Sequence, residues 1–579
     1  MNHHTSTSGS PNLWTMQADS SNSRQLLQTD QHQDEPLWTK DGQSILYVQD
    51  HGGDERFEIY RVSSRGGMPS RLTSLGQTSA INPVLSPDGK WIAFNTKREN
   101  DSFSNVAIMD LQSNKVRALT DQSDKTRSWT VAAWSPDGRA VYAMRGSPVF
   151  GDSAVYRIDV GSGEASNLTP HSGKISFQMT DVSPDGKTLS ITSNEGGYSN
   201  VALLNVESRQ QTWVTHTHWD AQAGYFSTRS GFEYALNADG RRSLVFVALP
   251  SMHSTKITLP NGMNYETGNP TPFSPDGTEL MAMHQDSTRP LDLWTIDLRR
   301  KNAKQITHSV DPSLSSIPLP QSQIVHYRSF DGTLISAFLW MPFNLKRDGA
   351  NPAVVYAHGG PSDQTTDEYN AIALALASRG YVIIAPNVRG STGYGLNFEE
   401  ANHKDLGGGD LKDEVYAAKF LISTGYVDAK RVGIAGGSYG GFMSMMAIGK
   451  TPTVWAAAAE EYGIVNWLSF VKHSDPYLQQ YIESLLGEPN KDRSLYEMSS
   501  PLDYFKNARA PLLVLQGAND IRVPKEEAIQ VVNLLRHQGK TVKARFYPGE
   551  GHGFTRRGDE IDALSRIVTW FDKFLKRQD

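Results

Sequence analysis

Ser438 lies in a Gly-x-Ser-x-Gly sequence whose flanks suit a nucleophile. Gly436-Gly437-Ser438-Tyr439-Gly440-Gly441 follows a short apolar stretch, 431–435, and precedes a second one, 442–448, with the length expected of a helix. A strand that turns sharply into a helix exposes the side chain at the turn, and glycine is required beside it because larger side chains would collide. The helix N-terminus favours developing negative charge. An ordinary glycine-rich turn is the alternative, so the prediction depends on partners for the serine.

A serine hydroxyl becomes a strong nucleophile only beside a base, which a third group must orient. Asp520 follows the apolar stretch 512–515, and His552 follows the next predicted strand, 543–547, in a glycine-framed loop. Nucleophile, acid and histidine in this order, each after a parallel strand, are typical of an α/β-hydrolase. We therefore expect His552 to be the base and Asp520 to orient it. A capping or turn aspartate is the alternative for Asp520, and Asn519 is a weak competitor.

Acyl transfer also requires hydrogen-bond donors for an oxyanion. The backbone N–H after the nucleophile, here that of Tyr439, usually supplies one donor, and an early strand-to-helix loop supplies the other. His358-Gly359-Gly360-Pro361 follows the apolar stretch 353–356 in that place. Because glycine leaves the backbone open to a substrate, we expect the Gly360 amide to be the second donor. A plain turn is the alternative.

The first half of the chain contains an internal repeat. Asp-Gly pairs, four of them within Ser-Pro-Asp-Gly, recur between short stretches of alternating apolar residues and predict turns between antiparallel strands. The pairs are Asp41-Gly42, Asp88-Gly89, Asp137-Gly138, Asp185-Gly186, Asp239-Gly240 and Asp276-Gly277. A further apolar strand follows, and several repeats end at Leu72-Thr73, Leu119-Thr120, Leu168-Thr169 and Ile306-Thr307. Four strands in a repeat of about 37 to 54 residues correspond to one propeller blade.

The repeats predict a β-propeller followed by a catalytic domain. Six repeats are complete, and 13–16 with 26–27 has the pattern of half of another. The sequence therefore allows either six or seven blades. We favour seven, with a degenerate seventh blade assembled from both ends of the propeller sequence. A Ser/Pro-rich stretch, 312–323, precedes the hydrolase strands. We expect an N-terminal segment 1–30 that packs on or completes the propeller, a propeller 31–320, and an α/β-hydrolase domain 321–579 with a mostly parallel, doubly wound sheet.

Composition narrows the classes of partner. The chain has 579 residues, 38% of them apolar, with a net charge of -6 and no cysteine. The charge argues against a nucleic-acid partner, and the lack of cysteine excludes disulfides and thiolate ligands. No apolar run approaches the roughly 18 residues of a membrane span, and 1–10 lacks the apolar core of a signal peptide. We expect a cytoplasmic protein without metal, cofactor or membrane partner.

These motifs together resemble the prolyl oligopeptidase family of serine peptidases, and within it the acylaminoacyl peptidase branch. The resemblance covers nearly the whole chain and includes the stretches 358–361, 387–395, 436–441 and 520–524. It implies Ser438, Asp520 and His552 as the triad, with the Tyr439 and Gly360 amides as the oxyanion hole. It also implies structural roles for Arg389, Asp410 and Asp413, usually seven blades, and often a homo-oligomer.

The substrate follows less directly from the sequence. A propeller that covered a hydrolase site would exclude folded proteins, which favours short peptides or acylated amino acids. Amides and esters both pass through an acyl-enzyme, so a carboxylesterase on the same scaffold is the alternative, and a non-catalytic propeller binding protein is a third interpretation. Dipeptidyl peptidases of this family resemble each other in holding the substrate amine with a Glu-Glu pair in the propeller. Residues 1–320 contain no adjacent glutamates, which disfavours that activity.

Glu460-Glu461 departs from the family pattern. The pair ends an apolar stretch, 456–459, and should lie at the same edge of the sheet as the triad. We hypothesise that one of the two carboxylates reaches the substrate pocket and favours a basic side chain or a free amine. Apolar walls of this pocket are expected from Tyr462, Trp467 and Phe470. A structural carboxylate that binds the backbone or an arginine is the alternative.

Overall fold

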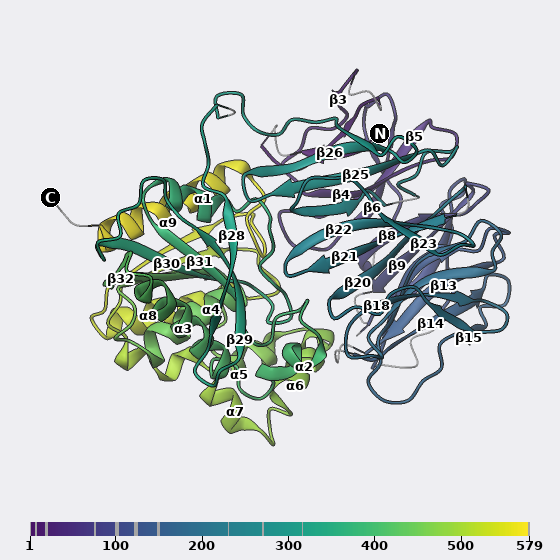
Figure 1. Ribbon diagram of the computed structural model, residues 1–579. Coiled ribbons are helices and arrows are strands. Elements are labelled where there is room, and N and C mark those ends of the chain that lie inside the picture. The colour runs from purple at the N-terminus through teal and green to yellow at the C-terminus, as the bar shows by residue number, and fades with distance from the viewer. Residues whose placement is uncertain are drawn as a thin grey trace. The chain divides into compact units, whose positions relative to one another are not determined.

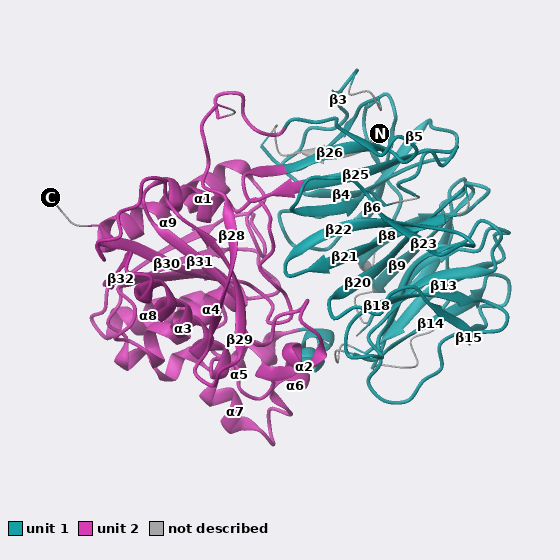
Figure 2. Cartoon of the chain, viewed as in Figure 1, with its two compact units in different colours: residues 1–284, 291–308, 475–481 teal, residues 285–290, 309–474, 482–579 magenta. Residues whose placement is uncertain are grey.

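The computed structural model describes residues 2–576, apart from 6–8, 18–20, 74–76, 99–102, 121–125, 148–150, 230, 269–270 and 315. The chain divides into two compact units (Figure 2). Unit 1 comprises Met1–His284, Leu291–His308 and Asp475–Tyr481, and unit 2 comprises Gln285–Pro290, Ser309–Ser474 and Ile482–Asp579. In the described part of the chain, no helix is both long and apolar enough to cross a membrane.

Unit 1 consists of β-sheets, several of which are antiparallel and have four strands (Figure 1). In spatial order they are β4 (Gln33–Trp38), β5 (Ser44–Gln49), β6 (Glu58–Ser63) and β7 (Ser70–Arg71); β11 (Val116–Ala118), β10 (Asn105–Asp110), β9 (Trp91–Arg98) and β8 (Gln77–Leu85); β12 (Ser128–Trp134), β13 (Ala140–Gly146), β14 (Ser153–Asp159) and β15 (Ala165–Asn167); and β16 (Phe177–Val182), β17 (Thr188–Ser193), β18 (Asn200–Asn205) and β19 (Gln211–Trp213).

Two further sheets complete the described strands of unit 1. The longer one has the order β20 (Asp220–Ser227), β21 (Gly231–Ala238), β22 (Arg241–Ala248), β24 (Met263–Glu266), β25 (Glu279–Asp286), β26 (Arg289–Asp297) and β27 (Asn302–Gln305), with β23 (His253–Lys256) paired to β22. The shorter one contains β1 (Asn2–Thr5), β2 (Asn12–Thr15) and β3 (Arg24–Gln25). Leu13 and Leu26 share a buried core with side chains of β5 and β6, so this N-terminal sheet packs on the first four-stranded sheet.

The Ser-Pro-Asp-Gly sequences form one recurring turn. Between β8 and β9, Ser86 Oγ donates to Asp88 Oδ1 at 2.7 Å, and Gly89 N donates to Ser86 O at 2.9 Å. The φ of Gly89 is 76°, a value that other L-residues rarely adopt. The same pair of contacts recurs in the turns at Asp137, Asp185 and Asp276. The repeat in the sequence therefore encodes a local structure that needs no distant partner.

The threonine that ends each of several repeats also has a local role. Thr73 Oγ1 accepts a hydrogen bond from the N–H of Ile59, near the start of the third strand of its sheet, at 2.8 Å. Equivalent contacts join Thr120 to Val106, Thr169 to Val155, Thr215 to Val201 and Thr307 to Leu293. Because a buried N–H needs a partner, the hydroxyl completes the hydrogen bonding of that strand.

Unit 2 is built on a mixed sheet that is mostly parallel. Its order is β28 (Ser322–Arg328), β29 (Leu334–Trp340), β31 (Val382–Asn387), β30 (Asn351–Ala357), β32 (Val427–Gly437), β33 (Ala457–Glu461), β34 (Leu512–Gly517) and β35 (Val542–Tyr547). The β28–β29 and β29–β31 pairs are antiparallel, and the remaining pairs are parallel. Strands β30, β31 and β34 are almost continuously apolar and buried, as strands covered on both faces usually are.

Helices cover both faces of this sheet. In Figure 1, α1 and α9 lie on one side of it, whereas α3, α4 and α8 lie on the other. Buried side chains of α1 and α9 form one core with strands of the sheet. The helices are α1 (Ala371–Ser378), α2 (Leu396–Glu399), α3 (Gly409–Ser423), α4 (Tyr439–Lys450), α5 (Trp467–His473), α6 (Pro476–Leu486), α7 (Arg493–Met498), α8 (Lys525–His537) and α9 (Arg557–Leu575), with 3-10 helices at Glu400–Asn402, Pro501–Asp503 and Phe505–Asn507. In such a doubly wound sheet, functional loops follow the carboxyl ends of the strands.

Candidate active site

Ser438 lies on the turn between β32 and α4. Its φ is 56°, a positive value that a non-glycine residue adopts only where the surroundings hold it. Ser438 N donates to Glu461 O on the neighbouring strand at 2.8 Å. A Cβ on Gly440 would lie 2.1 Å from Ala357 O, and one on Gly436 would lie 2.4 Å from the same atom. The close approach of β30 therefore requires the glycines on both sides of the serine.

The predicted nucleophile, acid and base meet at the carboxyl edge of the sheet. His552 Nε2 lies 3.0 Å from Ser438 Oγ, and His552 Nδ1 lies 2.9 Å from Asp520 Oδ2. The side chain of Asp520 is fully buried, whereas that of His552 is 12% exposed. Asp520 Oδ1 also accepts the N–H groups of Arg522 and Val523, at 2.9 and 2.8 Å. This geometry suits proton transfer from the serine to an imidazole that a carboxyl group orients.

The loops that carry the acid and the base are joined through their backbones. Ala518 N donates to Tyr547 O, and Asn519 N donates to Glu550 O, both at 2.9 Å. A Cβ on Gly517 would lie 2.1 Å from a carbonyl oxygen of the base loop, so only glycine permits this approach. The separation between acid and base is therefore fixed by main-chain contacts as well as by the side chains.

Two further contacts hold the base loop. The buried carboxyl group of Glu550 accepts the N–H groups of Thr555 and Arg556, at 3.0 and 2.9 Å. The ring centroid of Tyr462 lies 4.8 Å from that of His552. Sequence reasoning assigned no role to Glu550, whose contacts depend on how the loop closes. Its position two residues before His552 was the one feature of the sequence that could have suggested this role.

The loop after β30 passes beside the nucleophile. A Cβ on Gly359 would lie 3.9 Å from Ser438 Cβ, and Gly360 has a φ of 109°. His358 Nε2 lies 2.8 Å from Ser391 Oγ, and its Nδ1 lies 2.7 Å from Gly359 O. Burial lowers the pKa of His358, which favours a neutral ring that fastens this loop. The backbone of the predicted oxyanion loop is thus held next to the serine.

Tyr439, the first residue of α4, is anchored at the far end of its side chain. Its hydroxyl donates to Asp410 Oδ2 at 2.5 Å, and its ring packs against Phe442 and Trp467 with centroids 4.9 and 6.5 Å away. Burial raises the pKa of Asp410 to about 6. These contacts fix the residue whose backbone N–H is the predicted oxyanion donor.

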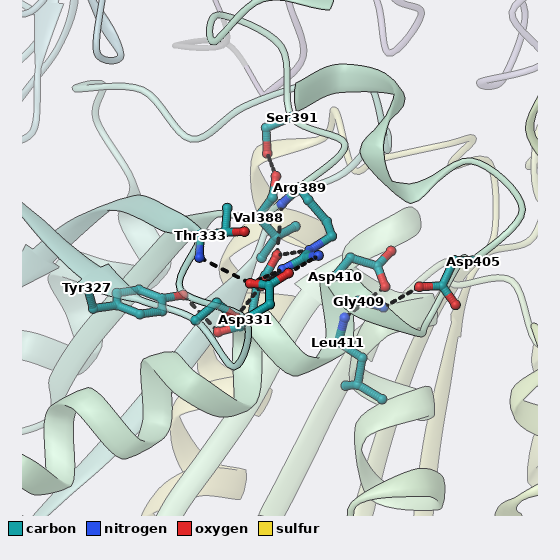
Figure 3. Close-up of polar contacts among 12 residues, drawn as sticks. Tyr327, Asp331, Thr333, Val388, Arg389, Ser391, Asp405, Gly409, Asp410 and Leu411 are labelled. Carbon is teal, nitrogen blue, oxygen red and sulfur yellow. Dashed lines mark hydrogen bonds and ion pairs between the residues drawn. The ribbon is translucent and has the colours of Figure 1, made fainter. Parts of the chain in front are cut away.

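Arg389 connects the loop after β31 to neighbouring elements (Figure 3). Its Nε and Nη2 donate to the two carboxylate oxygens of Asp413 on α3, both at 2.9 Å, and its Nη1 donates to Asp331 at 2.9 Å. Tyr327 donates its hydroxyl to the backbone oxygen of Asp413 at 2.8 Å. The hydrogen bonds to the two aspartates raise the pKa of Arg389. This network braces the start of α3, where Asp410 also lies.

The five residues predicted to form a substrate pocket differ in their contacts. Tyr462 lies beside His552, whereas Trp467 and Phe470 pack on each other with ring centroids 5.6 Å apart and are buried. Trp467 also contacts Tyr439. Glu460 and Glu461 are successive strand residues, so their side chains point to opposite faces of β33. The glutamates therefore occupy different surroundings.

The two glutamates differ in their contacts. Glu460 is fully buried, and its Oε2 accepts Gly463 N at 2.8 Å. Its Oε1 has no hydrogen-bond partner among the described residues. Glu461 is 8% exposed. Burial raises the pKa of Glu460 to about 8 and that of Glu461 to about 7.

Sequence profiles of known families match both halves of the chain. Residues 368–578 match the profile described as the prolyl oligopeptidase family, and this range includes Ser438, Asp520 and His552. Residues 2–132 match the profile of the TolB beta propeller domain. The N-terminal part is therefore a β-propeller domain, and the C-terminal part is an α/β-hydrolase domain.

Individual proteins show the same two likenesses. Dipeptidyl aminopeptidase BIII from Pseudoxanthomonas mexicana is 28% identical over 90% of this chain and 77% of its own length. An acylamino-acid-releasing enzyme from Arabidopsis thaliana is 30% identical over 39% of this chain and 30% of its own length. The structure of a Mycobacterium tuberculosis puromycin-hydrolyzing peptidase matches with a TM-score of 0.85 at 20% identity, covering 99% of this chain and 92% of that one. This last likeness shows the fold.

The raised pKa of Glu460 predicts how stability changes with pH. A carboxyl group whose folded-state pKa lies above its unfolded value stabilises the protein at acid pH, and this contribution is lost as pH rises through about 8. Glu460→Gln keeps the shape and an acceptor for Gly463 N but cannot ionise. Its free energy of unfolding should therefore decline less than that of wild type between about pH 5 and pH 9.

Denaturant unfolding at a series of pH values measures this difference. Glu497→Gln is the matched control, because the Glu497 side chain is 49% exposed. The control should follow the wild-type pH dependence. If the Glu460→Gln curve also runs parallel to wild type, Glu460 does not ionise on unfolding as described.

Proposed function

Because the catalytic unit of this chain belongs to the prolyl oligopeptidase family of serine peptidases, we propose that the protein hydrolyses short peptides or acylated amino acids through an acyl-enzyme. The observation that carries this proposal is the chain of hydrogen bonds from Ser438 Oγ through His552 to Asp520. These hydrogen bonds argue against a non-catalytic binding protein, because such a protein would have no need of a histidine 3.0 Å from the serine hydroxyl.

The proposed mechanism assigns a separate task to each group. Ser438 Oγ attacks the substrate carbonyl while His552 Nε2 takes its proton, and Asp520 orients the imidazole through Nδ1. The amides of Tyr439 and Gly360 hold the oxyanion of the tetrahedral intermediate. His552 returns the proton to the leaving group, and water then releases the acyl group by the same steps. The chemistry requires no cofactor.

The class of substrate rests on comparison as well as on chemistry. Dipeptidyl aminopeptidase BIII aligns over 90% of this chain, and the acylamino-acid-releasing enzyme from Arabidopsis thaliana aligns over 39% of it. The missing Glu-Glu pair in residues 1–320 favours a blocked over a free amino terminus. We therefore propose an acylaminoacyl-peptidase or oligopeptidase activity. A carboxylesterase on the same scaffold is the alternative.

The architecture around this function carries two further proposals. We infer a propeller of six or seven blades, preferably seven, because the N-terminal sheet shares a core with the first four-stranded sheet. We retain 1–30, 31–320 and 321–579 as the N-terminal segment, propeller and catalytic domain. A cytoplasmic location and homo-oligomer formation stay predictions from the sequence.

Three matched chromogenic substrates test the proposed function: an N-acetylated amino-acid anilide, its free-amine counterpart and a short acyl ester. Wild type should prefer the blocked anilide, and Ser438→Ala should lower turnover by about 10⁶-fold because the nucleophile is lost. The measurement is kcat/KM for each substrate with both proteins.

Each outcome separates the candidates. Preference for the free-amine anilide would indicate an aminopeptidase, and ester turnover with neither anilide cleaved would indicate a carboxylesterase. Hydrolysis that persists in Ser438→Ala would refute the assignment of the nucleophile.

We further propose that Glu461 favours a positive group on the substrate. Its backbone oxygen accepts Ser438 N, so the residue adjoins the nucleophile. The residue is 8% exposed, whereas Glu460 is fully buried. A substrate cation would stabilise the ionised form of a carboxyl group whose pKa burial has raised to about 7.

Glu461→Gln, which keeps the shape and removes the charge, tests this selectivity. The ratio of kcat/KM for arginine and lysine anilides to that for the phenylalanine anilide should fall about tenfold, because one favourable ionic contact is lost. Glu460→Gln is the control and should keep the wild-type ratio. An unchanged ratio in Glu461→Gln would eliminate the proposal.

A further inference from the structure

We propose that Gln516 is a positioning residue that fixes Asp520 against His552; this inference rests on the proposed function. Gln516 is the penultimate residue of β34 and is fully buried. It precedes the loop that carries the acid. Its amide contacts the Asp520 carboxyl group, as the imidazole of His552 does.

The Gln516 amide nitrogen is surrounded by acceptors from one loop. Nε2 lies 3.2 Å from Asp520 Oδ2, 3.1 Å from Gly517 O and 3.1 Å from Val523 O. These acceptors belong to the beginning, the middle and the end of the acid loop. The two N–H groups of the Gln516 amide are shared among these three acceptors. They therefore hold the acid loop folded around the Gln516 side chain.

The other end of the amide shows that this orientation has a cost. Gln516 Oε1 is buried and has no hydrogen-bond partner among the described residues. A buried oxygen without a partner is destabilising, and an apolar side chain of the same size would avoid it. Turning the amide over would place Oε1 against three acceptor oxygens, which is worse. The side chain is thus explained by a need for its N–H groups.

Gln516 acts on the oxygen of Asp520 that faces the base. Oδ2 accepts from both Gln516 Nε2 and His552 Nδ1, whereas Oδ1 accepts from the backbone N–H groups of Arg522 and Val523. Without the Gln516 donor, one backbone-bound oxygen stays fixed and the other is held by the imidazole alone. The negative charge of the Asp520 carboxylate is then stabilised by one donor fewer, so the carboxylate attracts a protonated imidazole more strongly. Both changes disturb the base and leave substrate contacts intact.

Two substitutions separate the donor from the volume it fills. Gln516→Leu keeps the bulk and removes the donor, so kcat should fall roughly 10- to 100-fold with KM unchanged. The acid limb of the kcat/KM profile should move to higher pH, because the imidazole is then protonated more readily. A purely structural role would change stability without moving this limb.

Gln516→Glu adds a carboxyl group that can donate only while it is protonated. At low pH this variant should be more active than Gln516→Leu. As pH rises, ionisation removes the donor and repels Asp520, so activity relative to wild type should decline. This decline runs opposite to the change expected of Gln516→Leu.

The test measures kcat, KM and the pH profile of kcat/KM for wild type, both Gln516 variants and Gln33→Leu. Circular dichroism confirms that each variant folds. Gln33 is a buried glutamine of unit 1 whose Nε2 donates to Gln49, so its substitution measures the general cost of losing a buried amide. Wild-type kcat and an unmoved acid limb in Gln516→Leu would overturn the inference. If Gln516→Leu does not fold, a pH profile of Gln516→Glu parallel to wild type would overturn it instead. Activity that persists in Ser438→Ala would refute the proposed function and leave the positioning role without a triad.

Discussion

The candidate site depends on the register of the parallel strands at the carboxyl edge of the unit 2 sheet. Gly437 pairs with Glu461, Glu461 with Leu515, and Gly517 with Tyr547, so β32 and β33 end at one level and β34 and β35 end together two residues further along. The loops directly after β32, β34 and β35 can therefore bring a serine, an acid and a histidine into contact. A slip of one residue in any of these pairs would turn each strand's side chains to the other face and separate the three groups.

Buried carboxyl groups near this edge differ in the donors that surround them. Asp520 accepts four hydrogen bonds, whereas Glu460 accepts one from Gly463 N and has an oxygen without a partner in the described part of the chain. Hydrogen bonds from N–H groups favour the charged form of a carboxyl group, and burial without them favours the neutral form. The same apolar sheet can thus hold carboxyl groups suited to different tasks.

Local sequence predicted the elements better than the contacts between them. The predicted strand 431–435 lies within β32, and α4 begins directly after Ser438. The Asp-Gly turns could be predicted because each Ser-Pro-Asp-Gly turn is closed by its own residues. The role of Gln516 could not be predicted from the sequence, because its contacts form only when the acid loop folds back on β34. Nor could the sequence predict that Trp467 and Phe470 of α5 pack on each other, whereas Tyr462 packs beside His552.

The central claim is that His552 activates Ser438. A fluorophosphonate reacts with an activated serine and leaves a stable adduct, which peptide mass spectrometry locates. The account predicts modification of Ser438 in wild type, with a rate at least about 10³-fold lower in His552→Ala because the base is gone. Modification of another residue, or an undiminished rate in His552→Ala, would contradict it.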